Sequence, residues 1–131
     1  MQTPKKALRI TAWIVGIMVG LVILAYIGIN LIIGLGVRGE SSRAVARFGG
    51  DRVEALIAEV DCGTCDIRDR NHAVWALGQL TDKRALPVLY KYYTGNPCEH
   101  RTQICQYELS TAIKWTEGNS FMLPRLWRPW I

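Results

Sequence analysis

Charged residues are missing from a long stretch near the N-terminus: residues 10–37 contain no Asp, Glu, Lys, Arg or His. As a helix this stretch would be about 42 Å long, whereas a bilayer core of about 30 Å needs roughly 20 apolar residues. Cleaved signal peptides have apolar cores of only about 7–15 residues, and a domain this small has no interior that could surround such a helix. The sequence therefore predicts a retained single-pass transmembrane helix at residues 10–37, after a basic flank at residues 1–9.

Cysteine is absent before Cys62, and all four cysteines follow the predicted span. An even number of cysteines clustered in one small domain is typical of an oxidising compartment. Basic residues near a span favour the cytoplasmic side, and the α-amino group gives the N-terminal flank a slight excess. We therefore expect a single-pass protein of a bacterial-type inner (cell) membrane, with a cytoplasmic N-terminus and a periplasmic or otherwise extracytoplasmic C-terminal domain. The flanking basic residues are Lys5, Lys6 and Arg9 before the span, and Arg38, Arg43 and Arg47 after it.

The chain also lacks any run of five like charges, although its formal net charge is +5. Without a basic stripe, nucleic-acid binding is not expected, and weak attraction to anionic lipid headgroups or an acidic partner is the most that this charge supports. No glycine-rich loop follows a strand, and no serine near His72 or His100 completes a catalytic triad. We therefore predict no enzyme and no cofactor, and we expect Glu54, Glu59 and Glu108 to lie on solvent-exposed helix faces.

No segment alternates apolar and polar residues as a half-buried strand would, so the predicted class is all-α. After a short juncture at residues 38–40, helix signals alternate with turns. The predicted N-caps include Ser41 or Ser42, Thr81 and Asp66, the last supported by a second aspartate three residues later. The helices are expected at residues 41–48, 51–60, 66–80, 81–93 and 99–115, with a last turn or two at residues 121–126.

The region after the span repeats itself at an offset of 32 residues, because residues 46–57 align with residues 78–89. Each copy reads as a helix end, a tight polar turn and a second helix. A third, looser copy runs from Ala112 to Leu126. Self-similarity at this period is typical of stacked helix pairs, so we predict an α-solenoid domain with an aromatic and basic tail at residues 41–131.

The best-defined copy, at residues 70–89, resembles a HEAT-like repeat of the short kind also seen in phycobilisome lyases. The resemblance rests on the string Ala-Leu-Gly-x-Leu-x-Asp-x-Arg-Ala-x-Pro-x-Leu from Ala76 to Leu89. It implies an α-solenoid over roughly residues 41–128 that holds other proteins. It does not imply lyase activity, because nothing beyond the repeat itself matches.

Cys62 and Cys65 form a C-x-x-C motif, but the βαβ setting of thioredoxin-type enzymes is absent. The repeat alignment matches Cys65 with Cys98 at an offset of 33, which places both in loops on one edge of the predicted solenoid. Two disulfides, Cys62–Cys65 and Cys98–Cys105, are favoured. The second requires Cys98 to lie in a loop, since seven helical residues would span about 10.5 Å. A zinc site from Cys62, Cys65, Cys98 and either Cys105 or His100 stays open, as do free thiols.

Two further features favour contacts with other molecules. Ala12, Gly16 and Gly20 share one face of the predicted span, and small residues at this spacing let membrane helices approach closely. The tail is rich in residues that suit a membrane interface, a protein interface or a cap on the open end of the solenoid. The candidate partner-binding residues in the tail are Arg125, Trp127, Arg128 and Trp130.

These features predict a membrane-anchored module for protein–protein interaction or scaffolding. It would work either as a homodimer or as an accessory subunit of a larger membrane complex. The alternative, from a different class, is a thiol–disulfide or zinc-dependent protein that uses the four-cysteine edge. Counting free thiols and bound zinc in the purified protein would separate the two.

Overall fold

The computed structural model describes residues 4–97, 99, 101–119 and 127–128. Every regular element among these residues is helical, which confirms the predicted all-α class for this part of the chain. The elements are α1 (Pro4–Phe48), α2 (Arg52–Asp61), α3 (Ile67–Leu80), the 3₁₀ turn η1 (Lys83–Ala85), α4 (Leu86–Tyr92), α5 (Gln106–Lys114) and the π-helical turn η2 (Trp115–Asn119).

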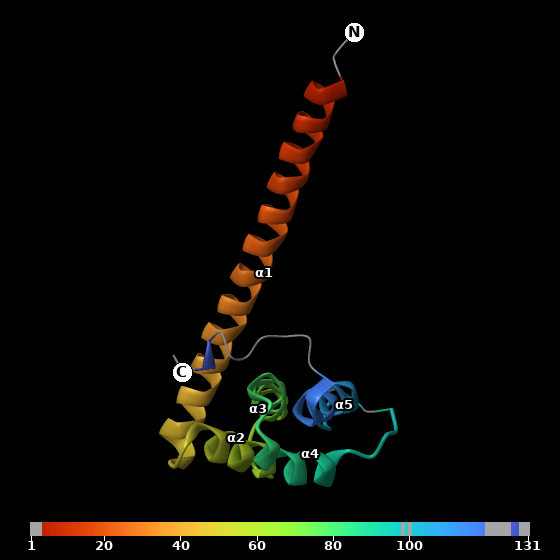
Figure 1. Ribbon diagram of the computed structural model, residues 1–131. Helices are drawn as coiled ribbons and strands as arrows, with labels where there is room; N and C mark the ends of the chain where they lie inside the picture. Colours follow the sequence, from red (N-terminus) through yellow and green to blue (C-terminus); the bar gives the residue numbers. More distant parts are fainter. Residues whose placement is uncertain (1–3, 98, 100, 120–126, 129–131) are drawn as a thin grey trace.

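Helix α1 is a single rod of 45 residues, about 67 Å long at a rise of 1.5 Å per residue. Its N-terminal half stands clear of the other helices, which gather at its C-terminal end (Figure 1). The segment Lys6–Phe48 is long and apolar enough to cross a membrane, and none of its most apolar window is buried inside the molecule. An exposed apolar surface of this size marks a site of contact with a membrane or with another protein.

The predicted juncture at residues 38–40 is not a break, and the separate helix predicted at residues 41–48 is the continuation of α1. Gly39 disfavours a helix by only about 1 kcal/mol relative to Ala, which packing against the domain offsets. Ser41 is not an N-cap, because its hydroxyl donates to the carbonyl of Arg38 within the helix at 3.2 Å.

A buried stripe on the C-terminal half of α1 holds the other helices. Asn30, Gly34, Val37, Ser41 and Ala44 are buried and recur every three or four residues, which is the spacing of one helix face. Helices α2 and α3 pack against this half of α1. The contact surface for the domain therefore begins inside the predicted transmembrane segment, well before its last residue.

The polar turns set the ends of α2 and α3 as predicted. Asp51 caps α2 by accepting from the amides of Val53 at 2.8 Å and Glu54 at 3.0 Å, and Glu54 completes a capping box. Asp66 caps α3 by accepting from the amide of Arg68 at 2.7 Å. Both predicted helices are confirmed to within a residue at either end.

The later helix boundaries differ from the predicted ones. Thr81 does not begin a helix: it ends α3 in the left-handed conformation, with φ 51°, and Asp82 caps η1 instead, because Asp is the stronger N-cap. Helix α5 begins only at Gln106, so the helix predicted at residues 99–115 is wrong over its first turns. The turn predicted at residues 121–126 lies outside the described residues.

Helix α3 is the central element of the domain, since it packs against α1, α2 and α5. Gly78 allows the close approach of α5: a Cβ added there would lie 2.9 Å from the Cα atom of Ala112. The four short helices share one core. Each contributes a fully buried leucine to it: Leu56 from α2, Leu77 from α3, Leu89 from α4 and Leu109 from α5.

Candidate functional site

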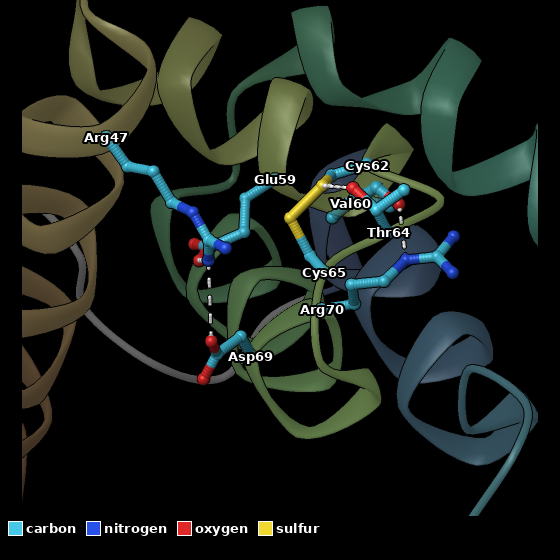
Figure 2. Close-up of a disulfide and its surroundings, with 8 residues drawn as sticks. All are labelled: Arg47, Glu59, Val60, Cys62, Thr64, Cys65, Asp69 and Arg70. Atoms are coloured by element: carbon cyan, nitrogen blue, oxygen red, sulfur yellow. Dashed lines mark hydrogen bonds and ion pairs between the residues drawn. A yellow bond between two sulfur atoms is a disulfide. The ribbon is translucent and has the colours of Figure 1, made fainter.

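The C-x-x-C motif lies in the loop between α2 and α3 (Figure 2), where Cys62 and Cys65 form a disulfide with Cα atoms 5.4 Å apart. This confirms the predicted Cys62–Cys65 pair. Both cysteines are partly exposed. Cys62 ends α2, and Asp66 directly after Cys65 begins α3, so the bridge joins the end of one helix to the start of the next.

The remaining two cysteines have different environments. Cys105 is half-buried and precedes α5, where its backbone N–H donates to the Asn71 side chain at 2.8 Å. Cys98 and His100 lie outside the described residues, so the Cys98–Cys105 bridge stays a prediction. Among the residues that the structure does describe, no group of three or more His, Cys, Asp and Glu side chains could hold a metal ion.

Polar contacts beside the disulfide tie the C-terminal end of α2 to α4. Arg70 Nε donates to the Val60 carbonyl at 2.9 Å, and the guanidinium lies 5.1 Å from the centre of the Tyr92 ring. Asp61 accepts hydrogen bonds from Lys91 and, at 2.7 Å, from Tyr92 Oη. The hydrogen bond from Lys91, followed by that from Tyr92, lowers the pKa of Asp61. The cations at this end of α2 also face the negative end of its dipole.

A second charged cluster joins α1 to α2 and α3 (Figure 2). Arg47 of α1 lies 3.6 Å from Asp69 of α3 and 3.9 Å from Glu59 of α2. Arg43, one turn earlier on α1, lies 3.6 Å from Asp69 and also pairs with Glu40. Two arginines of α1 are thus shared among three carboxylates, one from each of the three helices.

Glu59 has a different environment from the one predicted. It was expected on a solvated helix face, but its side chain is completely buried, whereas Glu54 is exposed as predicted. Neither carboxylate oxygen of Glu59 has a hydrogen-bond partner among the described residues. Burial raises the pKa of Glu59, against the opposing effect of Arg43 and Arg47. The sequence carried a signal for this position, because Glu59 follows Leu56 by three residues on the apolar face of α2.

Arg84 connects the polar turns that begin α2 and η1. Its guanidinium lies 2.5 Å from Asp51 and 3.1 Å from Asp82, and Arg128 also approaches Asp82, at 3.4 Å. The hydrogen bonds from Arg84 hold the pKa of both aspartates below the usual range. Since these turns belong to the two aligned copies of the repeat, Arg84 ties one copy to the next.

Of the four tail residues singled out, Trp127 and Arg128 are described, whereas Arg125 and Trp130 lie outside the described residues. Trp127 is only 3 % exposed, and partner binding through this tail stays a prediction. Trp127 covers Gly34 of α1, where an added Cβ would lie 2.8 Å from Trp127 Cβ. Packing against the rest of the molecule is the role that fits Trp127.

A second tryptophan uses a glycine of α1 in a similar way. A Cβ added to Gly36 would lie 3.2 Å from Cη2 of Trp75, which comes from α3. Neither contact was predicted, although Gly34 and Gly36 are the last two glycines within the apolar run. Glycines at the end of a predicted span, with tryptophans further along the chain, are the signal that could have indicated them.

The predicted helix-association face lies on the free half of α1. Ala12 and Gly16 line a shallow groove of about 430 Å³ together with Trp13 and Ile17. Nothing lies within 4 Å of the position that a Cβ would take on Gly16 or Gly20. This face is open to a second helix, and association through it stays a prediction.

Comparison with known proteins identifies one segment of the domain. Residues 69–94 match the family model described as PBS lyase HEAT-like repeat. The match covers most of α3 together with η1 and α4, and it confirms the resemblance predicted from the sequence. It includes Gly78 at the contact with α5 and the Asp82–Arg84 pair. No curated protein and no solved structure matched the chain.

Proposed function

We propose that this chain is a membrane-anchored protein-interaction module that works as a homodimer or as an accessory subunit of a membrane complex. One observation carries the proposal: α1 is apolar and free over its N-terminal half, while its C-terminal half is a packed member of the helical domain. That domain contains a HEAT-like repeat, a unit that suggests protein partners.

The helical domain would be a short α-solenoid in which α1 and α2 form the first helix pair and α3 and α4 the second. Helix α5 would begin a third pair. The contacts of α2 with α1 and α3, and of α5 with α3 and α4, support this order. Because each repeat contacts only its neighbours, the apolar faces at the two ends of so short a stack need a cap. The C-terminal half of α1 would cover one end, and a partner would bind at the other.

The proposed location is a bacterial-type inner membrane, with the N-terminus in the cytoplasm and the domain outside it. The Cys62–Cys65 disulfide supports this orientation, because disulfides persist in oxidising compartments. A membrane-impermeant thiol reagent applied to intact cells after mild reduction should label the domain from outside. Labelling only after the cytoplasmic face is opened would overturn the orientation.

The test of the function itself is chemical crosslinking in the native membrane, followed by purification of the full-length chain. A crosslinked homodimer, or one recurrent membrane protein recovered with the chain, is the expected result. The matched control is the same purification without crosslinker, which identifies proteins that adhere only after solubilisation. A chain that stays monomeric and recovers no partner in the crosslinked sample would overturn the proposal.

The thiol–disulfide alternative is favoured by one observation, the partly exposed Cys62–Cys65 bridge at the start of α3. A helix N-terminus stabilises a thiolate, whereas the flanking Asp61 and Asp66 disfavour it. Thiol counting and metal analysis of the purified chain separate the two functions. A bridge that is readily reduced and reoxidised, or one bound zinc per chain, would favour the alternative.

A further inference from the structure

The helical domain packs against α1 within the apolar run and not only after it. The buried stripe on α1 begins at Asn30 and continues through Gly34 and Val37, all of which lie inside residues 10–37. The uncharged run and the domain-binding surface therefore overlap over residues 30–37, which is about 12 Å of helix. A domain held on this segment cannot stand away from a bilayer that α1 crosses, because no flexible linker separates them.

The contacts between the domain and α1 change from charged to aromatic toward the N-terminus of α1. Near the end of α1 they are contacts between charged or titratable side chains, and within the uncharged run they are tryptophan rings lying over glycines. In this order the contacts are Asp69 with Arg47 and Arg43, His72 with Glu40, Trp75 with Gly36, and Trp127 with Gly34. Tryptophan is enriched where proteins cross the membrane–water interface, and charged pairs are found outside it.

The opposite face of the same segment is apolar and uncovered. Leu31, Ile32 and Leu35 are 53 %, 71 % and 69 % exposed, on a helix whose first charge after the span is Arg38. These side chains continue the exposed apolar surface of the N-terminal half of α1 without interruption. What covers the N-terminal half therefore also covers this face.

We propose that the helical domain is seated on the bilayer surface, with residues 30–37 of α1 in the lipid headgroup region and Leu31, Ile32 and Leu35 in contact with lipid. This inference rests on the proposed membrane anchoring. The lengths agree: residues 10–29 form about 30 Å of helix, the thickness of the hydrocarbon core.

The test uses the full chain with Cys98 and Cys105 replaced by Ser and the Cys62–Cys65 disulfide retained. Three variants with one free cysteine each are made in this background: Val22→Cys, Leu35→Cys and Ser42→Cys. All three positions are exposed on α1, and positions 35 and 42, two turns apart, share a helix face. Each variant is reconstituted at one chain per phosphatidylcholine–phosphatidylglycerol nanodisc, in which both membrane faces are accessible, and is labelled with a charged maleimide.

The expected result is that Ser42→Cys reacts at least tenfold faster than Leu35→Cys, and that Leu35→Cys and Val22→Cys are both slow. Labelling in denaturing detergent supplies the total reactive thiol for each variant. A Leu35→Cys that reacts as fast as Ser42→Cys, with Val22→Cys still slow, would overturn the seated domain and leave the anchoring intact. A fast Val22→Cys would instead overturn the anchoring. Protection of Leu35→Cys that appears only with two chains per disc would assign this face to a second copy and overturn the lipid contact.

Discussion

Arg47 on α1 and Glu59 on α2 face each other at 3.9 Å, with the carboxylate completely buried and the guanidinium half exposed. Removing a carboxylate from water is costly unless its oxygens are well hydrogen-bonded, and those of Glu59 have no hydrogen-bond partner among the described residues. Arg47 also forms an ion pair with Asp69, so its charge is shared between Asp69 and Glu59. The contact between α1 and the first short helix of the domain therefore contains a charge that weakens it.

We expect Glu59→Met to stabilise the full chain at neutral pH by roughly 1–4 kcal/mol, as when buried ionic groups are replaced by apolar ones of similar volume. Because the folded-state pKa of Glu59 is raised above its ordinary value of 4.5, ionisation costs stability. That cost is absent below pH 4.5, grows as the pH rises through the folded-state pKa, and is constant above it. Urea unfolding in detergent from pH 4 to pH 8, monitored by circular dichroism, measures the stability of the native chain and of the variant at each pH.

The control for this prediction is Glu108→Met on α5, where the native side chain is partly exposed. Its effect should stay within about 0.5 kcal/mol, as for most surface substitutions. The advantage of Glu59→Met over the native chain should shrink toward acid pH. A variant less stable than the native chain at every pH would mean that the ion pair with Arg47 contributes more than the burial costs.

Reductant should lower the melting temperature of the domain by a few degrees. The Cys62–Cys65 bridge closes a very short loop, so its contribution should be below about 2 kcal/mol. The double variant Cys62→Ser, Cys65→Ser should melt at the temperature of the reduced native chain. Any sensitivity to reductant that remains in this variant would report the predicted Cys98–Cys105 bridge, and a native chain indifferent to strong reductant would contradict both bridges.

Two glycines in helix interiors should respond to alanine in opposite directions. Gly78→Ala places a Cβ 2.9 Å from the Cα atom of Ala112, so it should destabilise the domain by about 1–3 kcal/mol. Gly39→Ala meets open space in the C-terminal half of α1 and should stabilise the chain by about 0.5–1 kcal/mol. Thermal melts of the two variants beside the native chain measure both signs at once. Equal effects would show that helix propensity, and not the contact between α3 and α5, decides the outcome at Gly78.

Replacing Gly16 and Gly20 by Leu should weaken any homodimer made through the N-terminal half of α1, because larger side chains keep the two backbones apart. Sedimentation in detergent or crosslinking in vesicles would show the loss of dimer. Gly28→Leu is the matched control, since it makes the same change in the same helix at a site that is equally open. Dimerisation that survives the double variant would exclude this face as the contact.

The parts of the fold that follow from local rules were predictable from the sequence. Asp51 and Asp66 fixed the starts of α2 and α3 because an N-cap acts within one helical turn. The apolar run predicted the helix α1, and the string around Gly78 predicted the HEAT-like repeat. The Cys62–Cys65 pairing was accessible for the same reason, since both residues share one loop.

What the sequence did not reveal depends on neighbours that are distant along the chain. Nothing local shows that α1 continues through Gly39, because the helix is held there by contacts with α2 and α3. Glu59 lies 3.9 Å from Arg47 of another helix, and Trp127 packs on a glycine inside the apolar run. In each case tertiary packing overrode the local preference on which the prediction rested.

The contact between Gly34 and Trp127 joins positions about 93 residues apart. In a chain whose first helix inserts while it is still being translated, Gly34 reaches the membrane long before Trp127 leaves the ribosome. The site on α1 therefore stays open while α2 to α5 are synthesised, and it closes only after Trp127 has been made. A product truncated before residue 127 would carry an uncovered patch beside the membrane, which is the kind of surface that quality-control proteases select.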